Sequence, residues 1–211
     1  ILSLEIKLKW MSGKHGKKYA VSMLDNLPKS PSYFTDRSRL IGMLSDSGEH
    51  QESIRRTKKL LKDLEQEKMW QDKSFSPTRM ACTVMLSIDY AALGDEDNAL
   101  KHINDNIKKI DLIKCGSEKI YALTFTTEAL HRLGKYEEAK PLIEQAYELN
   151  LEFKIGIINP HILSRYAHNL AFFGHTLQAL ELFDEGISFN TSNNYMSGVP
   201  YFKILMAKIY V

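Results

Sequence analysis

The sequence has only two cysteines, Cys82 and Cys115, and their spacing matches neither a disulfide framework nor a set of zinc ligands. It also lacks an uncharged apolar run of the ~18 residues that a membrane-spanning helix needs, and it shows no secretory signal peptide. Two cysteines fit a reducing compartment, so the cytoplasm is favoured. Because the first residue is Ile1 rather than methionine, loss of a signal or membrane segment, and a periplasmic location, stay open.

Charge of one sign is not in excess, which argues against direct binding of nucleic acid. Lysine and arginine number 28, aspartate and glutamate 26, and the net charge is +2. The balance conceals a gradient, because residues 1–62 hold 13 basic and 6 acidic side chains while the remainder holds 15 and 20. This basic end could contact an acidic partner or a membrane surface, although a solvated helical face is the simpler explanation.

Motifs that would support catalysis are missing as well. There is no glycine-rich phosphate loop, no nucleophile elbow and no HExxH helix. The adjacent carboxylates Glu137 and Glu138 fit the solvated first turn of a helix, where acid suits the dipole. Cys82 fits a packed, inert thiol better than a nucleophile. We therefore expect a protein that is not an enzyme and that carries no metal or cofactor.

What the chain does contain is a repeated helical hairpin, clearest over residues 117–150. Its first helix carries an apolar stripe with members three or four residues apart: Ile120, Leu123, Thr127, Leu130 and Leu133. A second stripe follows the turn at Gly134: Tyr136, Ala139, Ile143 and Ala146. Ser117 is the expected N-cap, and Gly134 is placed for a positive φ at the helix end. One hairpin cannot bury both stripes, so stacked neighbours are required.

This hairpin resembles the tetratricopeptide repeat. The matching residues are Gly134, Tyr136, Ala139, Ile143 and Ala146, whereas Thr127 and Leu151 replace the usual small residue and closing proline. The markers Gly48, Gly94, Gly134 and Gly174 are 46, 40 and 40 residues apart, longer than the standard period of about 34. The sequence is therefore most similar to the long-period repeats of bacterial regulatory proteins. The resemblance implies an all-α fold, a right-handed α-solenoid of antiparallel helix pairs.

About five hairpins and a terminal helix are expected, in one domain covering residues 1–211. The repeats fall at residues 1–28, 31–68, 76–113, 117–151 and 159–190, with a partial repeat at 200–211. Pro160 and Pro200 lie 40 residues apart, as do Ala167 and Ala207. The chain therefore stops inside a repeat, as expected for a fragment of a longer protein.

The resemblance also implies a concave groove lined by the first helix of each pair, which grips proteins or peptides. Carried over position by position from Gly134, the groove residues are Ser38, Gly42, Val84, Ile88, Thr124, Glu128, His131, Arg132, His161, Ser164, His168, Phe172 and Tyr201, with Ile204 extending the row. The lysines and asparagines with which chaperone-type repeats clamp a carboxylate are absent from the matching positions. An extended or helical peptide with mixed side chains suits this surface better than an acidic C-terminus.

Three histidines of this set, His131, His161 and His168, allow several interpretations. They could converge on a metal, but zinc ligands usually lie closer in sequence, as at i and i+4. They could also be ordinary polar groove residues or a pH-sensitive contact. We expect no metal.

Three functional hypotheses follow, all with protein or peptide partners and none with membrane contact in this part of the chain. The first is a non-catalytic scaffold, in which Glu128→Ala or His168→Ala weakens a partner without unfolding the chain. The second is a ligand- or peptide-sensing segment of a bacterial signalling protein, beside a diguanylate cyclase, histidine kinase or transcription regulator. The third is an oligomerisation module that self-associates through an open C-terminal helix exposing Phe202, Leu205 and Ile209.

Overall fold

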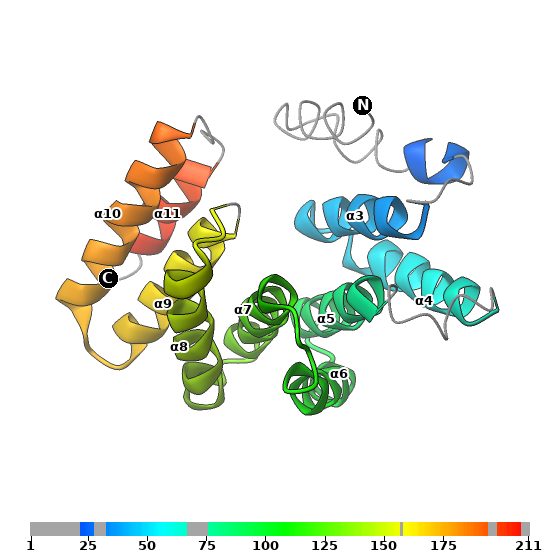
Figure 1. Ribbon diagram of the computed structural model, residues 1–211, viewed down its shortest axis with the longest axis horizontal. Coiled ribbons are helices and arrows are strands. Elements are labelled where there is room, and N and C mark those ends of the chain that lie inside the picture. The colour runs from blue at the N-terminus through cyan, green and yellow to red at the C-terminus, as the bar shows by residue number, and fades with distance from the viewer. Residues whose placement is uncertain (1–21, 28–32, 67–75, 157, 194–197, 208–211) are drawn as a thin grey trace. The chain divides into compact units, whose positions relative to one another are not determined.

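Helices are the only regular secondary structure in the part of the chain that the computed structural model describes, residues 22–27, 33–66, 76–156, 158–193 and 198–207. Residues 22–26 are helical. The labelled helices of Figure 1 follow them: α3 (Tyr33–Asp46), α4 (His50–Gln66), α5 (Ser76–Ala92), α6 (Glu96–Ile110), α7 (Gly116–Arg132), α8 (Tyr136–Phe153), α9 (Asn159–Phe172), α10 (Thr176–Ser192) and α11 (Gly198–Ala207). The predicted all-α class of antiparallel helix pairs is confirmed.

The helices pair as the repeats predict, α3 with α4, α7 with α8 and α9 with α10, while Tyr90 of α5 stacks on His102 of α6. Helix α11 begins the last repeat. Most of the first repeat, the linker at residues 67–75 and the end at 208–211 lie outside the described residues. The chain divides into two compact units, unit 1 (residues 1–106) and unit 2 (residues 107–211). A single domain of 211 residues stays a prediction.

Each hairpin turn repeats one hydrogen-bond pattern around a glycine. Gly48, Gly94, Gly134 and Gly174 all have positive φ, between 72° and 83°. The amide after each glycine donates to the carbonyl five residues earlier, as from Lys135 to Leu130 at 2.9 Å. This is the αL ending that favours glycine, because a Cβ strains the backbone there. The prediction of a positive φ at Gly134 is confirmed.

The apolar stripes are buried between hairpins. In the hairpin of residues 117–150, the side chains of Ile120, Leu123 and Leu130 lie in the core, and the small Ala139 and Ala146 are fully buried. Thr127 replaces the usual small residue of the first helix without leaving a polar group unpaired, because its hydroxyl donates to the Leu123 carbonyl at 2.9 Å. The stripes therefore do what the repeat predicts, which is to hold each helix against its neighbours.

Two predicted helix starts are wrong by one or two residues. Helix α7 begins at Gly116 with Cys115 as its N-cap, and Cys115 makes no side-chain capping bond that would mark a defined cap. Ser117 instead lies inside the first turn, with its Oγ 3.2 Å from the Cys115 Sγ. The pair Asn159-Pro160 predicts a cap followed by the first helical position, but Asn159 is itself the first residue of α9. Its Oδ1 accepts a bond from Asn150 Nδ2 at 2.8 Å.

The predicted open C-terminal face is also wrong where it is described. Phe202 and Leu205 are only 1% and 8% exposed. They pack in a cluster with Leu163, Ala167 and Phe183 of unit 2. Phe202 meets Phe183 edge to face, with the ring centroids 6.1 Å apart. Their burial removes the reason given for self-association, and Ile209 lies outside the described residues.

Candidate functional site

Helices α7 and α9 of unit 2 bring together six of the predicted groove residues with four that the prediction missed. We call this set the α7–α9 face: Phe125, Glu128, His131, Arg132, Tyr136, His161, Arg165, His168, Asn169 and Phe172. Hydrogen bonds, ion pairs and ring contacts connect its members, which come from α7, α9 and, for Tyr136, the first residue of α8. The face has an ionic part and an aromatic part.

The ionic part is centred on the Glu128 carboxylate. One oxygen accepts from Arg132 Nη2 of the same helix at 2.9 Å, and the other pairs with Arg165 of α9. Arg165 is buried, donates to the His161 carbonyl at 3.1 Å and lies over the Phe125 ring, 5.1 Å from its centroid. Glu128 is therefore a structural partner of a buried charge, so Glu128→Ala is not a clean test of binding.

The aromatic part is centred on Tyr136, the first residue of α8. Its ring stacks on Phe172 with centroids 4.1 Å apart and on His131 at 4.8 Å. The Tyr136 hydroxyl is 3.4 Å from Nε2 of His168. Buried Asn169 holds Tyr136 and His131 in place. Its side-chain amide donates to the Tyr136 carbonyl at 3.0 Å and lies 3.2 Å from His131 Nε2. Phe172 remains 55% exposed, so a rigid aromatic surface faces solvent.

Burial lowers the pKa of His131 to about 3, and the nearby His168 contributes to the same shift. The ordinary pKa of histidine is about 6.5, so between these values the unfolded chain binds the proton and the folded chain does not. Stability is therefore complete above about pH 6.5 and falls as the pH drops toward 3. The neutral ring is what allows His131 to pack against Tyr136.

This shift predicts how His131→Gln responds to acid. Between about pH 7 and about pH 5, the wild-type chain should lose about 1–2 kcal/mol more unfolding free energy than His131→Gln. Urea unfolding at the two pH values, followed by circular dichroism, measures the difference. The matched variant His175→Gln, at an exposed position, should lose as much as the wild type. Equal acid sensitivity of wild type and His131→Gln would contradict the assignment.

Several predicted groove residues are enclosed rather than exposed. Thr124 and Ser164 are buried, and their hydroxyls donate to the carbonyls of Ile120 and His161 within their own helices. In unit 1, Ser38, Val84 and Ile88 are buried and Gly42 is partly buried. The side chain of Tyr201 is outside what the structure describes, and Ile204 is exposed. Among the predicted groove residues whose side chains the structure describes, the polar and aromatic ones that stay at least partly exposed all belong to the α7–α9 face: Glu128, His131, Arg132, His161, His168 and Phe172.

The sequence contained a usable signal for the missed residues. His161, Arg165, His168, Asn169 and Phe172 are spaced four, three, one and three apart, which places them on one face of α9. Reading that whole face, rather than only positions transferred from the family, would have added Arg165 and Asn169. In the repeat pattern Tyr136 counts only as one of the residues that match the family, not as a groove residue.

The described residues hold no cluster of metal ligands, and one cluster of serine, histidine and aspartate lacks the order of a hydrolytic triad. Across those ranges no three histidine, cysteine or acidic side chains are grouped as metal ligands. Ser45, His50 and Asp89 do meet in unit 1, but Ser45 Oγ and His50 Nδ1 both contact Asp89 Oδ1, at 2.6 and 2.8 Å. In a hydrolytic triad the histidine stands between the other two. Here the buried aspartate does, and it ties α3, α4 and α5 together.

Two solved structures share this architecture. A Podosopora anserina kinesin light chain protein with nearly identical TPR-like repeats superimposes with a TM-score of 0.60 at 15% identity, over 87% of this chain and 88% of that one. Aspartyl phosphate phosphatase F from Bacillus subtilis gives a TM-score of 0.62 at 12% identity, over 99% of this chain and 59% of that one. The fold is tetratricopeptide-like.

No protein-family model matches the sequence. The tetratricopeptide-like chain is, however, 28% identical over 119 residues to response regulator aspartate phosphatase E from Bacillus subtilis. That alignment covers 54% of this chain and 30% of the relative, so the chain spans well under half of that protein. None of the described helices is both long and apolar enough to cross a membrane.

Proposed function

We propose that this chain is a protein-binding scaffold that holds a peptide or protein segment on the α7–α9 face. The observation that carries the proposal is the exposed Phe172 ring, stacked on Tyr136 and bordered by His168 and the Arg132–Glu128 pair. Aromatic and arginine side chains supply most of the energy at protein interfaces. Because hydrogen bonds already fix the face, little side-chain entropy remains to be lost on binding.

The face also indicates what kind of segment it suits. Phe172 offers an apolar ring face to an apolar or aromatic side chain of the partner, and Arg132 offers a partly exposed guanidinium to an acceptor. Two arginines against one glutamate leave this face with a net positive charge. We infer a segment that places an apolar side chain next to an acidic or amide one.

Bacterial signalling is the setting that the comparisons support. The sequence relative and one structural neighbour are both Bacillus subtilis proteins named as phosphatases of aspartyl phosphate, and the former acts by name on response regulators. We therefore propose a response regulator, or a peptide that controls such a partnership, as the bound protein. This is the regulatory-segment hypothesis joined to the scaffold hypothesis, and it assigns binding, with no catalytic step, to the described residues.

Alanine at Phe172 should weaken binding without destabilising the chain. Peptides selected by phage display on the full chain, and a purified bacterial receiver domain, serve as probes. We expect Phe172→Ala to lower their affinity about tenfold, corresponding to ~1.4 kcal/mol in isothermal titration calorimetry. The matched control is Leu177→Ala, because Leu177 is an exposed apolar residue of α10 outside the face, 77% exposed.

The control should change affinity less than about twofold. Equal losses in the two variants would place binding elsewhere on unit 2. Failure of both the selected peptides and the receiver domain to bind the wild-type chain would remove the proposal.

A further inference from the structure

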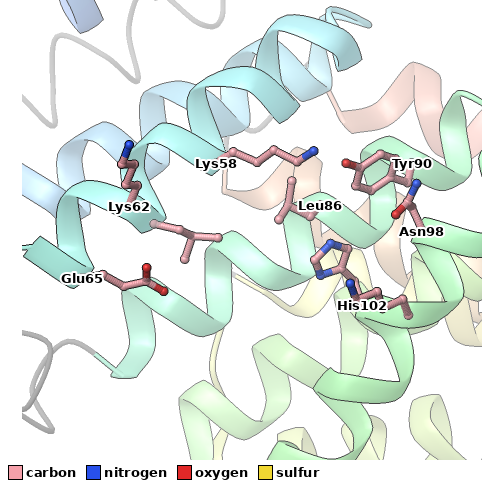
Figure 2. Close-up of a pocket in the computed structure, with 9 residues that line it drawn as sticks. Lys58, Lys62, Glu65, Leu86, Tyr90, Asn98 and His102 are labelled. Atoms are coloured by element: carbon pink, nitrogen blue, oxygen red, sulfur yellow. The ribbon is translucent and has the colours of Figure 1, made fainter.

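A pocket of about 560 Å³ lies among α4, α5 and α6 of unit 1, and none of its residues belongs to the α7–α9 face. It is lined by Lys58, Leu61, Lys62, Glu65, Leu86, Tyr90, Asn98, Lys101 and His102, most of which Figure 2 labels. The volume is within the range of small-molecule sites in proteins. Residues on three helices converge here, so the site exists only in the packed repeat.

The side chains that line the pocket carry a net positive charge. Lys58, Lys62 and Lys101 face a single carboxylate, Glu65, and none of the three amines forms an ion pair with a described residue. The arginines of the same helix differ, because Arg55 and Arg56 both bind Glu52 at 2.6 Å. The basic residues of α4 therefore include arginines paired with Glu52 and two lysines, Lys58 and Lys62, that line the pocket. Like charges held together in this way favour a bound anion.

The floor of the pocket is apolar and flat. Leu86 is buried and Leu61 partly buried. Tyr90 and His102 stack with centroids 5.7 Å apart and planes within 8°. Figure 2 shows Lys58 extending toward Tyr90, and its Nζ lies 5.4 Å from the centroid of that ring. A ligand in this pocket would contact the apolar side chains of Leu61 and Leu86 on one side and the Lys58 ammonium group on the other.

The two ends of the pocket differ in charge. Lys62 and Glu65 lie one and two turns beyond Lys58 along α4, and they roughly cancel each other. At the other end neither Lys58 nor Lys101 forms an ion pair with a described residue, although Asp97 and Asp105 lie one helical turn from Lys101. The nearby Asp95 is occupied as the cap of α6 and binds Asn98 at 3.2 and 2.8 Å. The pocket therefore suits charge at one end of a ligand and an apolar body at the other.

We propose that this pocket binds a small organic anion, with a carboxylate or phosphate group held by Lys58 and Lys101 and an apolar body over Leu61 and Leu86. Lysine serves both headgroups as a compact charge with several donors. This site is separate from the proposed protein-binding function, and either can fail without the other.

The test titrates the full chain with three probes that share one ring system: 1-naphthoate, 1-naphthyl phosphate and uncharged 1-naphthalenemethanol. We expect saturable binding of at least one anion, at least about tenfold tighter than that of the alcohol. The tighter of the two anions identifies the headgroup. The double variant Lys58→Gln/Lys101→Gln should lower that affinity about tenfold.

The matched control, Lys59→Gln/Lys108→Gln, also removes two positive charges, one each from α4 and α6, but at exposed positions outside the pocket. It should change affinity less than about twofold, which separates the pocket from the net charge of the chain. Circular dichroism confirms that both variants are folded. Equal losses in the two double variants, binding of the alcohol as tight as that of the anions, or no saturable binding of either anion would overturn the proposal.

Discussion

Replacing Glu128 with alanine should lower the unfolding free energy of the chain by about 2–4 kcal/mol. The cause is Arg165, whose guanidinium is buried between α7 and α9 and pairs with this carboxylate. Its hydrogen bonds to the His161 carbonyl and Ser164 Oγ go to uncharged acceptors and do not replace the lost negative charge. A buried charge without its counter-ion is far more costly than the loss of a surface pair. Urea unfolding followed by circular dichroism measures the change.

The same carboxylate provides its own control. Arg132 pairs with Glu128 from an exposed position, so Arg132→Ala should cost no more than about 0.5 kcal/mol. Adding Arg165→Met to Glu128→Ala should recover most of the lost stability, because the buried charge then disappears as well. A Glu128→Ala chain as stable as Arg132→Ala would show that the buried pair contributes no more than the surface pair.

Gly186→Ala should destabilise the chain by about 3 kcal/mol, at the upper end of the usual cost of overpacking. A Cβ at this position of α10 would overlap the Cε1 and Cζ atoms of Phe202. Phe202 is fully buried and has no free direction in which to move. Alanine is the better helix former by about 1 kcal/mol, but that gain is smaller than the cost of the overlap. Thermal unfolding in the calorimeter reports the net effect.

Gly116→Ala is the matched control, because a Cβ there also approaches a phenylalanine ring, that of Phe153. Phe153 is half exposed and can rotate away, so this variant should stay within about 0.5 kcal/mol of the wild type. Phe202→Leu combined with Gly186→Ala should lose less than the sum of the two single changes. Full additivity would mean that the two residues do not contact each other.

The hairpins could be predicted from the sequence because their determinants are local. A glycine in the αL region and a stripe with members three or four apart act within one helix pair, so Gly134 and Ala139 lie where the pattern places them. Ser117 is predicted as the cap of α7 because serine caps helices well. The helix begins at Gly116, however, so Ser117 lies inside its first turn. Element boundaries depend on such small differences.

The contacts between repeats could not be predicted in the same way. Burial of Phe202 depends on the missing side chain of Gly186, on a different helix. The Glu128–Arg165 pair joins residues 37 apart in the sequence, and the lysine pocket needs three helices. A stripe shows which face of a helix is buried but not which side chain of the next repeat lies opposite it. Transfer of family positions therefore found partly exposed His168 and exposed Phe172 together with buried Thr124 and Ser164.

The central claim, that the α7–α9 face holds the partner, is tested most directly by photo-crosslinking. A benzoylphenylalanine at position 172 retains an aromatic ring on the face, and the same residue at position 177 serves as the control on α10. The account predicts that irradiation joins a bound peptide or receiver domain to position 172 and not to position 177. Crosslinking from position 177 alone, or equally from both, would contradict it.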